Sequence, residues 1–306
     1  MRKAKINFFQ ESLIFLQILV CLFSISCSKL NREKIIDKKE LTREDYRLFQ
    51  NTPAWELAKA VQDENEKRVN EILAENPKLI DFQENRFGST LLILTVRNQQ
   101  YKSFEILLKN KTDVNIHDTY EGSSALIEAC SYNLYDIKFV ETLLQNGANV
   151  NVAQVDIDKE GKTKTALMKT AQTGNLNLVK LLVEKKANLN YQNEYGQSAL
   201  SESIMRNHYK VSFYLLQNGA EYKQPIFYRP GYSVPNSKKG QPVYLVDFLR
   251  EVFLDFGTDE YKCKMQIVDF LKSKGIDYSA VPIPDFIKEK AQKKYPKNWL
   301  EYLEKY

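Results

Sequence analysis

The stretch 165–182, TALMKTAQTGNLNLVKLL, decides how this chain folds. A small residue, Thr170, follows its first apolar pair and lets two helices approach closely. Gly174 tolerates the left-handed backbone conformation that ends a helix. Apolar residues at helical spacing then come at Leu178, Leu181 and Leu182. The stretch therefore predicts two short helices that are separated by a sharp turn and pack side by side.

The same pattern returns along the chain. A core leucine recurs at spacings of 34, 41 and 33 residues, at Leu92, Leu126, Leu167 and Leu200. A small residue follows each of them by three positions, and a turn position follows by seven, at Gln99, Asn133, Gly174 and Asn207. A double leucine comes about 15 residues after each core leucine, and a turn such as Gly-Ala-Asn-Val-Asn at 147–151 closes the unit. One helix pair cannot bury its apolar face alone, so the repetition predicts a stack.

These units resemble the ankyrin repeat, which has about 33 residues and a T-P-L-H-x-A core. Ala166 and its equivalents Leu91, Ala125 and Ala199 stand where the family has Pro; Met168 and its equivalents Ile93, Ile127 and Ser201 stand where it has His. The tetratricopeptide repeat has a similar period but lacks the Gly-Ala-x-Val-Asn turn. The resemblance implies an all-α solenoid of stacked helix pairs with short hairpin turns, which binds another macromolecule and is not an enzyme.

The repeats divide the chain into regions. Residues 51–225 are predicted to hold about five repeats, beginning with a degenerate unit at 55–81. Residues 226–306 are predicted to hold a degenerate sixth repeat, at 242–278, and C-terminal capping helices. Three Pro and two Gly in 224–240 indicate a long loop between repeats five and six.

The 41-residue spacing indicates an insertion at 152–162. Extra residues in a solenoid map to loops on one face. We therefore expect an exposed, elongated hairpin tip that folding does not require. Asp156, Asp158, Glu160 and Gly161 imitate the start of a calcium loop, but its twelfth position, which should be a bidentate Glu, is Leu167.

The N-terminus is typical of an exported bacterial lipoprotein. Arg2, Lys3 and Lys5 precede the apolar stretch 13–23. This stretch is too short to span a bilayer, because a membrane-spanning helix needs roughly 20 residues. Ser-Ile-Ser-Cys27 follows and resembles the lipobox, although Ser24 stands where Leu is usual. Residues 1–26 are thus predicted to be a lipoprotein signal peptide and Cys27 the acylated (palmitate-bearing) N-terminus. A plain cleaved signal peptide and an uncleaved anchor are the alternatives.

Residues 27–50 mix both charge signs and have few apolar side chains, which predicts a charged tether, in part helical. The predicted lipoprotein signal and tether together predict a protein of the bacterial cell envelope that is lipid-anchored to a membrane and either periplasm-facing or surface-exposed.

Catalytic and cofactor-binding constellations are not found in the sequence. His208 fits a structural turn position, and His117 has no second ligand at metal-binding spacing. Cys130 and Cys263 are too far apart in the stack for a disulfide. A net charge of +5 over 306 residues does not indicate nucleic-acid binding. We therefore expect no catalytic residues, no cofactor, no metal and no nucleic acid.

Partners of ankyrin proteins generally meet the hairpin tips and the inner helices, as the resemblance implies. The candidate partner-binding residues are Phe87, Tyr120, Tyr195, Arg97, Tyr132 and Arg206. Rigid aromatic residues are enriched at binding hot spots. The alternative is that the aromatic residues before the turn Gly pack locally onto the neighbouring hairpin. The sequence thus predicts a membrane-tethered protein-binding module. The alternative is a structural or protective envelope lipoprotein without a single defined ligand.

Overall fold

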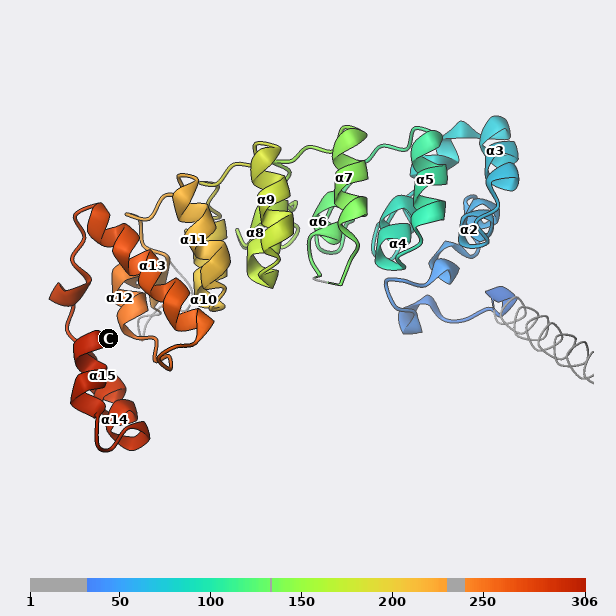
Figure 1. Cartoon of the computed structure of the whole chain (residues 1–306). Coiled ribbons are helices and arrows are strands. Elements are labelled where there is room, and N and C mark those ends of the chain that lie inside the picture. Colours follow the sequence, from blue (N-terminus) through green and yellow to red (C-terminus); the bar gives the residue numbers. More distant parts are fainter. Residues whose placement is uncertain (1–31, 133, 230–239) are drawn as a thin grey trace, which may run out of the picture.

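A computed structural model describes residues 32–132, 134–229 and 240–306. In these residues six successive helix pairs stand side by side in a row, and two further helices, α14 and α15, follow at the C-terminal end (Figure 1). The all-α repeat solenoid predicted from the sequence is confirmed. We call the first helix of each pair the inner helix and the second the outer helix.

The inner helices are short, and a capping side chain fixes where each central one begins. They are α2 (Trp55–Gln62), α4 (Leu91–Arg97), α6 (Ala125–Ala129), α8 (Ala166–Thr173), α10 (Ala199–Met205) and α12 (Leu245–Arg250). In the four central repeats the preceding Ser or Thr oxygen accepts a hydrogen bond from the backbone N–H three residues on; the caps are Thr90, Ser124, Thr165 and Ser198. Such a cap stabilises a helix by about 1 kcal/mol.

The outer helices follow after the predicted turns. They are α3 (Glu66–Glu75), α5 (Tyr101–Lys109), α7 (Ile137–Gln145), α9 (Leu176–Glu184), α11 (Tyr209–Gln217) and α13 (Asp259–Ser273). Gln99, Gly174 and Asn207 have φ values of 55°, 78° and 62°, so the left-handed turn is confirmed at these positions. The fourth predicted turn position, Asn133, lies outside the described residues. A side chain at Gly174 would collide with the His208 ring, whose Nε2 lies 3.2 Å from the Gln172 carbonyl oxygen.

A polar ladder joins consecutive repeats at the turns after the outer helices. The side-chain oxygen of Asn115 accepts a hydrogen bond from the Asn149 N–H at 2.9 Å. Asn151 accepts one from the Asn188 N–H at 2.6 Å, and Asn190 accepts one from the Glu221 N–H at 2.8 Å. The Asn that ends each of these three turns therefore satisfies a backbone donor of the next repeat.

One hydrophobic core runs through the stack, from Leu41 to Tyr278. The core leucines Leu92, Leu126, Leu167 and Leu200 are all buried. A second, smaller cluster joins α14 (Asp285–Lys294) to α15 (Trp299–Lys305) through Ile287, Ala291, Tyr302 and Tyr306. Phe253 and Phe256, which follow α12, pack against it.

The N-terminal segment differs from the predicted charged tether. Residues 32–50 include the 3-10 helices η1 (Lys38–Glu40) and η2 (Tyr46–Phe49). Leu48 and Phe49 are fully buried in the main core, and the Tyr46 hydroxyl donates to the Gln100 side-chain oxygen at 2.5 Å. The scattered apolar residues thus pack this segment against the first repeats. Their contribution to the core was not predicted, because they have no regular spacing among the charged residues.

Most of the long loop expected at 224–240 lies outside the described residues, and the described residues on either side of 230–239 pair as strands. Strands β1 (Phe227–Arg229) and β2 (Gln241–Val243) pair antiparallel, with Tyr228 opposite Pro242. The 3-10 helices η3 (Pro77–Asp81) and η4 (Tyr278–Ala280) follow the first and sixth outer helices. The C-terminal stretch forms two helices, α14 and α15, which are interrupted at Pro296.

The insertion forms an exposed hairpin, as its spacing predicted. Ala153 bridges to Thr165, and the Gln154 N–H donates to the Lys164 carbonyl at 3.0 Å. The Asp156 carboxylate accepts hydrogen bonds from the N–H groups of Glu160 and Gly161 and so shapes the turn. The hairpin also contacts the hairpin before it, because the Val155 N–H donates to the Gly122 carbonyl at 2.8 Å.

Candidate functional site

A row of hairpin tips precedes the inner helices, and a buried polar side chain shapes the tips before α4, α6 and α10. Asp118 accepts hydrogen bonds from the N–H groups of Tyr120 and Glu121, at 3.2 and 2.8 Å. Glu84 and Asn193 likewise accept hydrogen bonds from backbone N–H groups in the tips before α4 and α10. These bonds fix the backbone of the three tips.

The tip before α6 and the inserted hairpin enclose a cleft of about 190 Å³, which we call the tip cleft. Its lining residues are Tyr120, Glu121, 154–158, Glu160, Lys162 and Thr163. Tyr120, Val155 and Ile157 are 56%, 47% and 41% exposed and line the same cleft, and such a group is more informative than a single exposed apolar side chain. Four carboxylates, of Glu121, Asp156, Asp158 and Glu160, lie around them. The tip cleft therefore combines exposed apolar contact area with negative charge.

Four of the six predicted partner-binding residues reach the surface. Tyr120, Tyr132 and Arg206 are exposed, and Tyr195 is half-exposed with the Lys162 ammonium 6.0 Å above its ring. Of these, only Tyr120 lines the tip cleft. The structure thus brings Tyr120 together with the inserted hairpin, whose apolar residues were not among the predicted site residues.

Phe87 does not belong to the exposed surface. Its ring is buried and packs edge-to-face against Tyr120, with ring centroids 5.2 Å apart. The Arg86 guanidinium covers its other side at 4.5 Å. Here the alternative interpretation, local packing onto the neighbouring hairpin, is correct.

Arg97 is also not part of an exposed surface, although it lies on an inner helix. Its guanidinium is buried between the carboxylates of Asp118 and Glu128, at 2.8 and 3.2 Å. It donates to the Ser89 hydroxyl at 2.8 Å as well. Arg97 therefore joins the hairpin tips before α4 and α6 to the inner helix α6 and has a structural role.

A second arginine, Arg43, reaches this cluster from the N-terminal segment. It lies 2.5 Å from Glu121 and 3.4 Å from Glu128, and its guanidinium is 5.5 Å from the centre of the Tyr120 ring. No local sequence pattern indicates this contact, because 78 residues separate Arg43 from Glu121. The contact shows that Tyr120 and Glu121 together can hold a guanidinium group.

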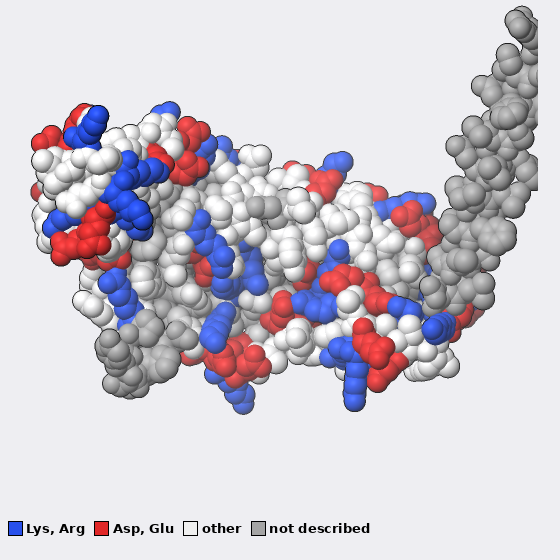
Figure 2. Space-filling view, turned by 90° about the horizontal axis from the view of Figure 1, so that it is seen from below, with Lys and Arg blue, Asp and Glu red and all other residues white. Residues whose placement is uncertain are grey.

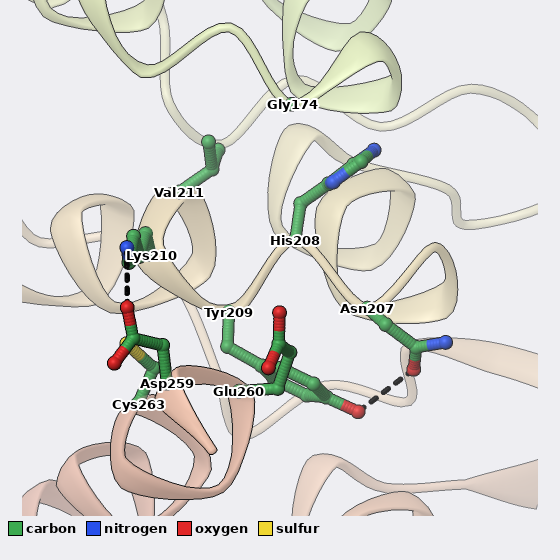
Figure 3. Close-up of a pocket in the computed structure, with 9 residues that line it drawn as sticks. All are labelled: Gly174, Asn207, His208, Tyr209, Lys210, Val211, Asp259, Glu260 and Cys263. Carbon is green, nitrogen blue, oxygen red and sulfur yellow. Dashed lines mark hydrogen bonds and ion pairs between the residues drawn. The ribbon is translucent and has the colours of Figure 1, made fainter.

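A different cleft, also of about 190 Å³, lies between the end of α8, the start of α11 and the start of α13 (Figure 3). The Lys210 ammonium lies 3.5 Å from the Asp259 carboxylate, and the Tyr209 hydroxyl donates to the Asn207 side chain. Burial raises the pKa of the Cys263 thiol, so this thiol is a weaker nucleophile than an ordinary cysteine. The cleft offers less for recognition than the tip cleft, because none of its lining residues is an exposed large apolar side chain.

The charges of the stack are mixed. Lys and Arg alternate with Asp and Glu over the described part of the face seen in Figure 2, and neither sign covers it. Residues 32–132, 134–229 and 240–306 bring no three His, Cys, Asp or Glu side chains into an arrangement that could hold a metal ion. In the same residues, no helix has the length and apolar character needed to cross a bilayer. The position of Cys27 lies outside the described residues.

These features define a repeat solenoid in which hairpin tips are exposed, whereas the inner helices α4, α6 and α10 are largely buried. The sequence model of the family described as ankyrin repeats, in three copies, matches residues 57–154 and 152–225. The chain therefore belongs to the ankyrin-repeat family, whose fold is a protein–protein interaction module.

Relatives match part of this chain. A putative ankyrin repeat protein of Acanthamoeba polyphaga mimivirus is 28% identical over 134 residues, which are 44% of this chain and 16% of the relative. Another from the same virus is 32% identical over 103 residues, 33% of this chain and 63% of the relative. The ankyrin repeat and KH domain-containing protein mask-1 of Caenorhabditis elegans is 23% identical over 199 residues, 56% of this chain and 7% of the relative. The chain thus covers less than two thirds of the length of each of these relatives.

Proposed function

We propose that this protein is a membrane-tethered, non-catalytic module of the bacterial cell envelope that binds a partner protein through the tip cleft. The observation that carries the binding half is the exposure of Tyr120, Val155 and Ile157 beside one another at a rigid tip. Solvent-exposed apolar side chains that line one cleft favour a protein contact. Aromatic residues held by a fixed backbone lose little conformational entropy on binding, which makes Tyr120 the expected hot spot.

The tethering half rests on the sequence before the repeats. Positive residues, a short apolar stretch and Ser-Ile-Ser-Cys27 follow one another in the order of a lipoprotein signal. Two or three acyl chains on Cys27 would hold the protein stably, since each buried methylene contributes roughly 0.8 kcal/mol.

The docked N-terminal segment shortens the predicted tether. Packing against the repeats involves Arg32, which lies 2.7 Å from Asp63 beyond the inner helix α2. Only five peptide steps separate Cys27 from Arg32, and a fully extended chain spans at most ~3.6 Å per residue. An acylated Cys27 would therefore lie within about 18 Å of the first repeat. The stack would be held with its N-terminal end next to the membrane.

Replacing Cys27 by Ala tests the tether. We expect the wild-type chain to incorporate a clickable palmitate analogue and to sediment with membranes. The Cys27→Ala chain should incorporate none and should leave the membrane fraction after carbonate washing, because it has no site for acylation. Cys21→Ala serves as the matched control and should behave as wild type. Equal labelling of the Cys27→Ala chain would remove the tethering half and leave the binding half standing.

The binding half predicts that a partner protein touches Tyr120 and Ile157 in the intact envelope. Cross-linking from these two positions detects such a contact directly, whatever the identity of the partner.

A further inference from the structure

Charged side chains occupy one equivalent position on three neighbouring inner helices. Two residues after the core leucine come Glu128 on α6, Lys169 on α8 and Glu202 on α10. We call these three residues the inner row. Helix α8 packs against both α6 and α10, so Lys169 lies between the two glutamates.

The two glutamates of the inner row are paired within the chain. Glu128 accepts from Arg97 at 3.2 Å and from Arg43 at 3.4 Å. Glu202 lies 3.0 Å from the Lys164 ammonium, which also donates to the Gln172 side chain. Both carboxylates therefore have a cationic partner other than Lys169.

Lys169 differs from its two neighbours. Its side chain is half-buried, yet within the described part of the chain its ammonium takes part in no hydrogen bond and no ion pair within 4.0 Å. Burial lowers the pKa of Lys169, and repulsion from Lys164 lowers it further. The carboxylates of Glu121, Glu128 and Glu202 act in the opposite direction. A partly desolvated ammonium without an acceptor is unfavourable for the isolated protein. Such a group favours an acceptor that arrives from outside.

The charges around Lys169 limit what that acceptor can be. Glu121, Glu128 and Glu202 act on Lys169 electrostatically, so any anion that reaches it also meets their fields. A carboxylate of charge −1 matches the single positive charge of Lys169, whereas the second charge of a phosphate group would be left facing the glutamates. The carboxylates of the tip cleft, which includes Glu121, favour a basic residue elsewhere in the same partner. The best match is a protein segment that carries both charge signs.

We propose that Lys169 anchors a partner protein by binding an Asp or Glu side chain of a segment whose basic residue lies toward the tip cleft. This inference rests on the proposed binding function and deepens it by naming the chemistry of the partner. Lys169 acts here as a specificity residue, because a partner that brings a neutral or basic group would leave the ammonium desolvated and unpaired.

The test selects random 12-residue peptides displayed on phage against the whole chain purified in detergent. A selected peptide is then titrated against wild type, Lys169→Met and Lys138→Met. Lys138 is exposed on the outer helix α7, so its variant is the matched control. We expect Lys169→Met to weaken binding at least about tenfold and Lys138→Met to change it less than about twofold.

Two further measurements separate recognition from folding. Changing the acidic residue of the peptide to its amide should weaken binding to wild type as much as Lys169→Met does, and should have no further effect on that variant. The melting temperature of Lys169→Met should equal or exceed that of wild type, because an unpaired, partly desolvated charge is removed. Binding that Lys169→Met leaves within twofold of wild type overturns the inference but keeps the binding module. Failure to select any peptide with an acidic residue also overturns it, whereas the cross-linking from Tyr120 and Ile157 tests the proposed function independently.

Discussion

Arg97→Met is expected to lower the free energy of unfolding by about 3–5 kcal/mol, because it leaves two buried carboxylates without their cation. The guanidinium lies 2.8 Å from Asp118 and 3.2 Å from Glu128, and all three side chains are buried. Arg43 still reaches both acids, at 3.6 and 3.4 Å, but it is tied to Glu121 and cannot replace both bonds. The Asp118 carboxylate also shapes the hairpin tip, so its repulsion from Glu128 would loosen the tip cleft.

Urea denaturation followed by circular dichroism measures this loss. Arg68→Met is the matched control: Arg68 lies 3.2 Å from Glu71 on α3, and both side chains are about half exposed. An exposed pair contributes about 0–1 kcal/mol, so the control should unfold almost as wild type does. If Arg97→Met unfolded at the same urea concentration as the control, the buried cluster would not stabilise the stack.

Lys264→Met is expected to stabilise the C-terminal part of the protein at neutral pH, by on the order of 3 kcal/mol. The Lys264 side chain is fully buried on α13, its ammonium donates to the Val252 carbonyl at 3.1 Å, and it lies 3.8 Å from the centre of the Tyr306 ring. Burial, followed by the charge of Arg250, lowers the pKa of Lys264 to about 7. Methionine fills a similar volume and has no charge to desolvate.

The stability gained by Lys264→Met should decrease as the pH rises above about 7. In the unfolded chain Lys264 keeps a proton up to a pKa of roughly 10.4, but in the folded protein only up to about 7. Between these values the unfolded state binds more protons, so wild-type stability rises with pH. Burial raises the pKa of Tyr278 and Tyr306, which therefore stay neutral over most of this range.

Denaturation at pH 6.5 and pH 9 checks this prediction. The advantage of Lys264→Met over wild type should be largest at pH 6.5 and smaller at pH 9. Lys262→Met, on the exposed face of the same helix, should show little difference from wild type at either pH. A destabilised Lys264→Met protein, or an advantage that does not change with pH, would contradict the assigned protonation.

The repeat architecture was predictable because its determinants are local. Thr165 caps α8 within three residues, and Gly174 ends that helix nine residues later. Such signals repeat at fixed spacing, so each unit supports the next. The insertion was visible for the same reason, as a departure from the spacing that places extra residues at a tip.

The site residues were less predictable because burial depends on distant segments. Phe87 and Tyr120 both precede a tip Gly, yet only Phe87 is covered, by Arg86 and by Tyr120 itself. Arg97 lies on an inner helix as expected, but the pairing with Asp118 and Glu128 requires the next hairpin. The role of Arg43 could not be found from local patterns, because a mixed-charge segment gives no periodic signal.

The C-terminal tyrosines show the same limit. Tyr278 and Tyr306 lie over the Arg250 guanidinium, at 4.3 and 5.6 Å, and Tyr306 also contacts Lys264. These four residues come from four separate segments between 250 and 306. Their sequence pattern predicted helices but did not indicate a buried cluster of cations and aromatic rings.

The central claim, that a partner protein binds at the tip cleft, is tested most directly by photo-cross-linking in intact cells. A photoreactive phenylalanine analogue is placed at Tyr120, at Ile157 or, as a control on an outer helix, at Lys138. We expect one discrete adduct from positions 120 and 157, containing the same protein in both cases, and no such adduct from position 138. Absence of an adduct from 120 and 157, or the same adduct from all three positions, would contradict a partner site at the tip cleft.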